Sequence, residues 1–435
     1  MDGGTWSLGY AAREIMPDDL GQKRYFMSGY GANKPVTGVY EPLYVRAALI
    51  SAGETAILFL VFDLTGMARN DVQAIRTAVV GALGGAVDAV HLLFTHSHAA
   101  IDTMGLWGDL ENGISGRDET YIELCRARAV EAAQAAAVDM RTGTLSFGQT
   151  PGLRDAVMDI RSPAVSDSRL TRLRFRPDDG SAETVILHFN CHPETLGGEN
   201  TLISPDYPAE LIRRYEEKSG ARALFFNGCV GGMQTVPIFR DGEGAPLPLR
   251  EQMLRMGRML ASVALAIQDS ELPPFIDDRS AAVTLPMENP AFQTAVQRGI
   301  LNQPLSAGEG NGYVCETELG VTILGGLKWI RVPGELFPEL LLGGMLRSED
   351  CANPNAEAET ALCRVFGADA LVLGLCDDEI GYILPENDFY LDASQPYIAR
   401  GIDRFGRRHY EETNSLGPQT ARRLISALTE LWAAK

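Results

Sequence analysis

Short apolar runs alternate along the chain with segments in which apolar positions recur every three or four residues. The runs are rich in β-branched and aromatic residues, which is typical of buried strands. They predict strands over 43–50, 55–62, 90–95, 184–190, 223–226, 321–332 and 370–375. The second pattern predicts helices over 70–83, 118–137, 207–218, 250–268, 335–346 and 416–432.

This alternation predicts an α/β fold with a mixed β-sheet core and flanking helices. Asp118 is the expected N-cap of one helix, with Glu119 in its first turn. We expect a single catalytic domain over 1–435, without a C-terminal β-domain. A candidate internal seam lies near 273–312, which holds Pro-Pro, Asn-Pro and the glycine-rich loop 308–312.

The composition of the chain limits the classes of function that it can have. Hydrophobic residues make up 45% of the 435 positions, enough for a sizeable core. The net charge of −19 disfavours nucleic acid and anionic membrane surfaces as partners. No signal peptide and no apolar run of transmembrane length is recognisable, and the seven cysteines form no CxxC pair. A cytoplasmic location is therefore expected, while the oligomeric state stays open.

Two histidines follow the apolar run that ends at Phe94, in the sequence Phe94-Thr-His-Ser-His98. If the strand continued, His96 and His98 would point the same way. Imidazole is a good Zn²⁺ ligand, and the ends of strands position ligands rigidly. Because the chain has only six histidines, this pair favours a metal site over an ordinary polar loop.

A second histidine pair lies in Leu187-His-Phe-Asn-Cys-His-Pro193. Pro193 has no N–H to donate to a β-ladder, so the strand should end there, with His192 at its carboxyl end. His192 is the expected ligand, whereas His188 is expected to be a buried histidine satisfied by the backbone. Cys191 is expected to be a small core residue.

Glu335 and Tyr382 are weak signals when each is taken alone. Glu335 follows Val332-Pro-Gly at a predicted strand–turn–helix junction, where a first-turn carboxylate is common. Tyr382 follows the acidic segment Asp377-Asp-Glu379, and tyrosine is usually a packing residue. Only the order of the motifs along the chain makes both residues candidates for the site.

That ordered set resembles the N-terminal catalytic domain of the neutral/alkaline (non-lysosomal) ceramidase family. The motifs are Thr-His-Ser-His, Ile-Arg-Ser-Pro, Cys-His-Pro-Glu, Pro-Gly-Glu and Gly-Tyr-Ile-Leu-Pro-Glu-Asn-Asp-Phe, at 95–98, 160–163, 191–194, 333–335 and 381–389. Each motif is short, but the order is specific, and the resemblance extends over nearly the whole chain.

The resemblance implies one Zn²⁺ ion held by His96, His192, Glu335 and Tyr382, a set of N and O donors that suits zinc. It also implies roles around the metal. His98 and Tyr382 would assist catalysis as acid/base and charge stabiliser, and Arg161, Ser204 and Asp206 would bind substrate. Gln234 stands where the family has an active-site serine. A zinc-activated water is therefore the expected nucleophile.

The function that follows is a zinc-dependent amidohydrolase that cleaves a linear N-acyl amide, or a related acyl bond, of a small acylated molecule. Two alternatives remain. The chain could be an inactive metal- or ligand-binding relative, or an esterase or lactonase acting on a small soluble substrate. No GxSxG, GxGxxG or Walker A sequence occurs, so serine esterase and nucleotide chemistry have no support.

Overall fold

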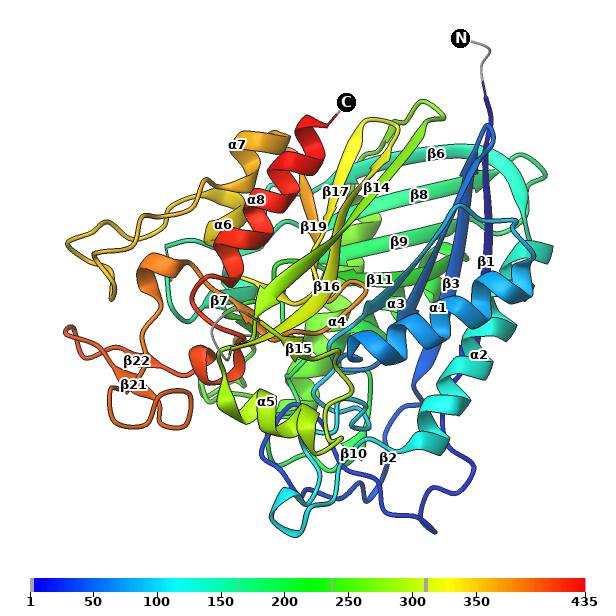
Figure 1. Ribbon diagram of the computed structural model, residues 1–435. Coiled ribbons are helices and arrows are strands. Elements are labelled where there is room, and N and C mark those ends of the chain that lie inside the picture. Colours follow the sequence, from blue (N-terminus) through cyan, green and yellow to red (C-terminus); the bar gives the residue numbers. More distant parts are fainter. Residues whose placement is uncertain (1–3, 163, 236–237, 309–311, 435) are drawn as a thin grey trace.

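A computed structural model describes residues 4–162, 164–235, 238–308 and 312–434 (Figure 1). The larger sheet has the strand order β11-β9-β8-β6-β1-β3-β4-β5, and β13 pairs with β6. Its strands are β1 (Trp6–Glu14), β3 (Tyr44–Ala52), β4 (Thr55–Phe62), β5 (Ala89–Phe94), β6 (Arg141–Gln149), β8 (Thr171–Pro177), β9 (Thr184–Phe189), β11 (Arg222–Asn227) and β13 (Ser270–Glu271). The pairs β4–β5 and β9–β11 are parallel and the others antiparallel, so the sheet is mixed.

A second sheet has the order β14-β16-β17-β19, with β15 beside β16. Its strands are β14 (Ile276–Pro286), β15 (Ser306–Ala307), β16 (Tyr313–Leu324), β17 (Leu327–Arg331) and β19 (Leu371–Leu373). Short two-stranded ladders join β2 (Gly38–Val39) to β10 (Leu202–Ile203), β7 (Val157–Asp159) to β12 (Met233–Thr235), β18 (Glu335–Leu336) to β20 (Tyr382–Ile383), and β21 (Gly401–Ile402) to β22 (Arg408–His409).

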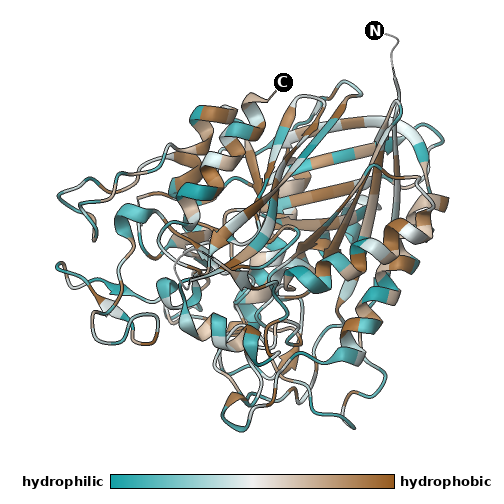
Figure 2. Cartoon of the chain, in the orientation of Figure 1, coloured by the Kyte–Doolittle hydropathy of each residue, from teal (hydrophilic) through white to brown (hydrophobic). Residues whose placement is uncertain are grey.

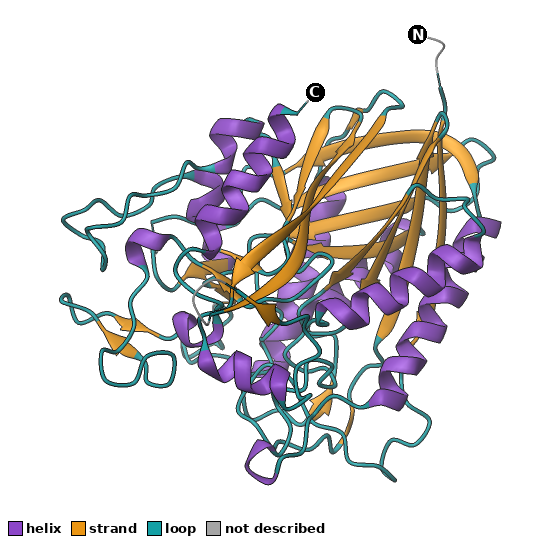
Figure 3. Cartoon of the chain, in the orientation of Figure 1, coloured by secondary structure: helices purple, strands orange, loops and turns teal. Residues whose placement is uncertain are grey.

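The two sheets pack face to face, and helices cover their outer sides (Figures 1 and 3). The helices are α1 (Arg69–Leu83), α2 (Glu119–Val138), α3 (Tyr207–Ser219), α4 (Leu249–Ala266), α5 (Pro290–Gln297), α6 (Pro338–Leu342), α7 (Leu362–Phe366) and α8 (Thr420–Ala433). Asp118 caps α2 by accepting from the Tyr121 N–H, as predicted. None of the helices in the described part of the chain is long and apolar enough to cross a bilayer.

Successive side chains of a strand point to opposite faces of its sheet, and this alternation explains how the layers pack. In β4, Leu58 and Leu60 pack with α1 and α2, whereas Ile57 and Phe59 face the second sheet. In β17, Trp329 joins the core between the sheets while Ile330 packs with α8. Both faces of β4 are therefore buried, which is why its sequence is almost continuously apolar (Figure 2). The predicted fold class, a mixed sheet with flanking helices, is confirmed.

Two predicted elements need correction. The run 321–332 is two strands, because Gly325 and Gly326 adopt positive φ of 59° and 99° and turn the chain between β16 and β17. The predicted helix 335–346 shortens to α6, because Glu335–Leu336 pairs with β20 and Gly343 has a φ of 84°.

The segment expected to be an internal seam holds regular structure. It contains β14 and α5, and β14 pairs along its length with β16. Residues 309–311 of the expected glycine-rich loop lie outside the described chain. The single-domain organisation stays a prediction.

Candidate metal centre

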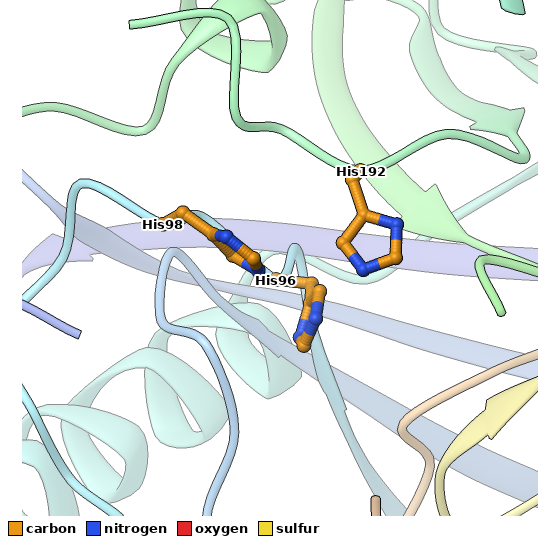
Figure 4. A group of neighbouring side chains, drawn as sticks. All are labelled: His96, His98 and His192. Atoms are coloured by element: carbon orange, nitrogen blue, oxygen red, sulfur yellow. The ribbon is translucent and has the colours of Figure 1, made fainter. Parts of the chain in front are cut away.

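Three histidine rings converge at the carboxyl ends of β5 and β9 (Figure 4). The ring centroids of His96 and His192 are 4.9 Å apart, and His98 lies 5.0 Å from His96 and 5.3 Å from His192. One nitrogen of each ring lies within 4.8 Å of the others, so a single metal ion can reach all three. A separation of more than about 10 Å between His96 and His192 would have excluded a shared ion, but the two residues are neighbours.

His96 reaches this position through a turn rather than through a continued strand. β5 ends at Phe94, and His96 adopts a left-handed backbone conformation with a φ of 66°, which is costly for a residue with a Cβ. The turn is held from both sides. The Asn227 side chain donates to the Thr95 carbonyl, and the His98 N–H donates to the carbonyl of Pro193. The strand therefore does not continue through His96 and His98, so the condition under which both side chains would point the same way is not met, although their rings do meet.

Hydrogen bonds to the backbone orient the two ligand candidates. Nδ1 of His96 donates to the Thr65 carbonyl at 2.7 Å, and Nδ1 of His192 donates to the Met233 carbonyl at 2.9 Å. Each imidazole therefore presents its Nε2 lone pair to the site, which is the tautomer that binds a metal. Their shared target is Glu335, whose Oε2 lies 2.8 Å from Nε2 of His192 and 3.6 Å from Nε2 of His96.

Charge couples these groups. Burial opposes the imidazolium of His192, but its hydrogen bond to Glu335 and the charge of that carboxylate raise the pKa of His192 to about 9. Burial opposes the anion of Glu335 as well, but His96 and His192 hold the pKa of its carboxyl well below the usual range. Glu335 is therefore paired with a protonated His192 in the absence of a metal, and a divalent metal that displaces this proton would fit the same N and O donor set.

Tyr382 completes the predicted ligand set by its place in the β18–β20 ladder, where it is the partner of Glu335. Its ring packs against Phe337 and Tyr410. Burial and the charge of Glu335 raise the pKa of its hydroxyl well above the usual value. Without a nearby cation this phenol therefore stays protonated.

His98 lies beside the ligand candidates and has its own support. Burial and repulsion from His96 and His192 lower the pKa of His98 well below its usual value, so the ring is neutral. Gly29 makes room for it, because a Cβ there would lie 2.4 Å from Cγ of His98. Glu194 Oε2 is 3.8 Å from Nδ1 of His98 and accepts from the Tyr30 hydroxyl at 3.0 Å.

A mainly apolar cavity of about 90 Å³ opens beside the histidines. His96, His98, Glu335 and Tyr382 line one end, and Glu379 also contributes to its wall. This volume holds several waters or a short chain of carbon atoms. The apolar wall includes Met104, Trp107, Met287, Phe292, Leu301 and Ile380.

Apart from His192, which contacts Glu335, four predicted site residues do not line this cavity. Ser204 is buried and donates to Glu41, and Asp206 is the N-cap of α3. Gln234 lies in β12 and lines a neighbouring hollow with Tyr30 and Glu194. Of these three, Gln234 is linked to the site through its neighbour Met233, which supplies the carbonyl that orients His192.

Arg161 is the fourth, and its environment differs from the expected one. Its side chain is 9% exposed, and its guanidinium contacts Glu411, Glu412 and Asp388 at 2.9–3.1 Å. The guanidinium therefore pairs with three carboxylates, which the sequence did not predict, and its role toward a substrate oxygen stays a prediction. Pro163, the last residue of its motif, lies outside the described chain.

Two residues of the site had no clear signal in the sequence. Glu194 directly follows His192-Pro193, and only this neighbourhood could have pointed to it. Glu379 ends the acidic segment that begins at Asp377, which resembles a solvated charge run. Burial distinguishes Glu379, because burial and the charge of Glu335 raise the pKa of its carboxyl well above the usual value.

A second set of potential ligands, around His91, is occupied by a protein cation. His91 Nδ1 lies 2.9 Å from Asp377, and its Nε2 lies 3.1 Å from Asp278. Arg331 contacts the same two aspartates, at 3.3 Å each. This cluster is an ion-pair network between the sheets, and the guanidinium already supplies its positive charge.

Comparison with solved structures identifies the architecture. The structure of neutral ceramidase from Pseudomonas aeruginosa superposes with a TM-score of 0.74, covering 100% of this chain and 75% of that chain. The fold is that of the neutral ceramidases. A ceramidase complexed with C2 superposes with a TM-score of 0.72, covering 99% of this chain and 75% of that one. Sequence identity is 16% in both cases, and the ceramidase fold therefore persists at low identity.

No protein-family model matches the sequence, and no curated protein sequence matches it significantly. The likeness to ceramidases therefore rests on tertiary structure and on the ordered motifs. Both point to the same place in the molecule, since the His96, His192 and Glu335 motifs meet at one end of the cavity.

Proposed function

We propose that this protein is a zinc-dependent hydrolase that cleaves the amide bond of a small N-acyl compound. The observation that carries the proposal is the convergence of the Nε2 atoms of His96 and His192 on Glu335 at the end of an apolar cavity. His96, His192 and Glu335 would hold the zinc, with Tyr382 as the fourth ligand. Zinc bound there would supply a Lewis acid and an activated water at neutral pH.

The remaining residues have roles that follow from their positions. The apolar wall of the cavity excludes water from the acyl chain and holds it by burial. His98 is neutral and lines the cavity, so its ring can accept a proton from the nucleophile and return it to the leaving amine. Glu194 would orient that ring. Tyr382 lines the same cavity, so as a zinc ligand it would lie beside the charge that develops on the substrate oxygen and help to stabilise it.

The cavity argues for a compact substrate. A volume of about 90 Å³ accommodates a short acyl chain more readily than two long ones. Esters and lactones share the acyl carbon that is attacked, so they belong in the same assay. An inactive binding protein would take up zinc and ligand without turnover.

The test combines metal analysis with a panel of amides, esters and lactones of short and long acids. We expect about one zinc per chain and hydrolysis of short-chain amides that is lost on chelation and restored by zinc. His192→Ala should lose both zinc and turnover, whereas His188→Gln, outside the site, should keep both. Zinc uptake without turnover on any substrate would favour the binding protein, and trapping of an acyl group on a serine would contradict the metal-water mechanism.

A further inference from the structure

Glu379 is a buried carboxylate in the wall of the histidine cavity. The residue is 7% exposed, and its Oε1 accepts from the Gly381 N–H at 2.8 Å. Its Oε2 is buried and has no hydrogen-bond partner among the described residues. The chain leaves space for this side chain, because a Cβ on Gly66 would lie 2.8 Å from Cγ of Glu379.

The neighbours of Glu379 supply no counter-charge. Among the described residues that line the cavity there is no lysine or arginine. The nearby Arg69 pairs with Glu318 at 2.8 Å. Asp378 accepts from Gln303 and Thr317, and burial raises the pKa of its carboxyl to about 7.

Glu335, the other carboxylate of the cavity, is matched by His96 and His192 and would be matched further by a metal. Glu379 is therefore the carboxylate of this cavity that lacks a cation. A buried carboxyl without a partner disfavours its anionic form, and a ligand that brings a positively charged donor stabilises the anion.

The aromatic side chains favour the same kind of ligand. Trp107, Phe292 and Tyr410 line the cavity that Glu379 also lines. The faces of such rings attract an ammonium group and tolerate an alkyl chain equally well. A carboxylate or phosphate placed beside Glu379 would instead meet an acidic group, with no lysine or arginine among the described residues that line the cavity.

We propose that the substrate is an acylated amine that carries a second, cationic amino group, and that Glu379 receives this ammonium. The inference rests on the proposed hydrolase function and names its substrate class. Glu379 determines specificity: it accepts a charge-assisted hydrogen bond through Oε2 while Oε1 stays on the Gly381 N–H. Selection against anionic substrates follows from the absence of a basic residue among the described lining residues.

The test compares three hexanoyl amides that differ in one terminal group. The amines are 1,4-diaminobutane, butylamine and 4-aminobutanoate, giving cationic, neutral and anionic substrates of similar size. For the wild type we expect kcat/KM to fall in that order. In Glu379→Gln, which keeps the oxygen that accepts from Gly381, the cationic-to-neutral ratio of kcat/KM should fall by about 10- to 100-fold.

A binding measurement that does not require turnover tests the role of Glu379 independently. Calorimetry should show that 1,4-diaminobutane binds the zinc-loaded wild type and binds Glu379→Gln at least about tenfold more weakly. Glu339→Gln, a buried carboxyl outside the cavity, is the matched control, and zinc content and thermal unfolding verify that each variant is intact.

The outcomes separate the two proposals. An unchanged cationic-to-neutral ratio in Glu379→Gln, or a wild type that prefers the anionic amide, would overturn the role of Glu379. If no amide is cleaved, the hydrolase proposal fails, and the calorimetric comparison alone then decides whether Glu379 selects a cation: Glu379-dependent diamine binding supports it, and equal or absent binding overturns it.

Discussion

Glu335 and Tyr382 are paired residues in the two-residue parallel ladder between β18 and β20. The ladder joins segments that are separated by nearly fifty positions and places a carboxylate and a phenol on the same side. Glu335 also receives His192 at 2.8 Å, so one short ladder connects the histidines to the tyrosine. The ladder is the backbone pairing that holds Tyr382 beside Glu335 and hence beside the histidines.

Glu335→Gln should weaken zinc binding by at least about 100-fold, because mutation of groups that only support a ligand already costs up to that much. The apoprotein should stay folded, since glutamine fills the same volume. Zinc titration of chelated protein measures the effect. Glu339→Gln is the control: burial and the nearby Asp159 raise the pKa of Glu339 to about 8, so glutamine replaces a carboxyl that is already neutral at pH 7. Equal zinc affinity of the two variants would exclude Glu335 as a ligand.

Glu194→Gln should lower kcat by about 10- to 100-fold while zinc content stays unchanged, because the residue supports the His98 ring rather than the metal. KM should change little. The exposed Glu199→Gln in the same loop is the control. A loss of zinc in Glu194→Gln would show that the residue acts on the ligands instead.

Gln234→Ala should reduce the rate without abolishing it. Gln234 lines the neighbouring hollow, and its effect on the centre passes through the Met233 carbonyl that holds His192. We expect a loss within about tenfold, below the 10²–10³ that follows the removal of a direct oxyanion donor. Steady-state kinetics on the best amide measures it, and a loss of 10³ would return Gln234 to the catalytic groups.

Arg161→Met should lower the free energy of unfolding by roughly 3–5 kcal/mol, because it removes the guanidinium that three buried carboxylates share and leaves only Asp388 with another arginine, Arg407. Denaturant unfolding gives the value. Arg126→Met on the surface of α2 removes an exposed pair with Glu123 and should cost at most about 0.5 kcal/mol. If Arg161→Met kept full stability and lost only activity, the guanidinium would belong to the substrate site after all.

Protonation of His188 should lower the free energy of unfolding in acid. Burial lowers its pKa from the ordinary value of 6.5 to about 4, while its Nε2 donates to the Val372 carbonyl. The folded state thus prefers the neutral ring. Its stabilising effect is complete above pH 6.5 and is lost as the pH falls toward 4, by on the order of 3 kcal/mol.

His188→Gln keeps a donor for Val372 and removes this titration. Free energies of unfolding of chelated protein at pH 7.5, 5.5 and 4.5 should therefore fall less steeply for the variant than for the wild type. Parallel pH dependence of the two proteins would show that His188 is not the responsible group.

The apolar patterns of the sequence determined the long elements. The strand predicted over 55–62 coincides with β4, and the helix with Asp118 as its cap coincides with α2 within a residue. These elements follow from periodicity and capping, which depend on neighbours a few positions away. The ordered motifs likewise pointed to His96, His192, Glu335 and Tyr382 before any geometry was known.

Only the tertiary structure decided how these elements meet. The turn at His96, the packing of one sheet on the other and the ladder between Glu335 and Tyr382 depend on contacts between distant segments. Arg161 lies two positions from Asp159 in sequence, yet its guanidinium pairs with carboxylates from residues 388 to 412. Glu379 resembles a solvated charge until the fold buries it beside the cavity. Side-chain roles of this kind are set by desolvation and by partners far along the chain, and neither is written in local sequence.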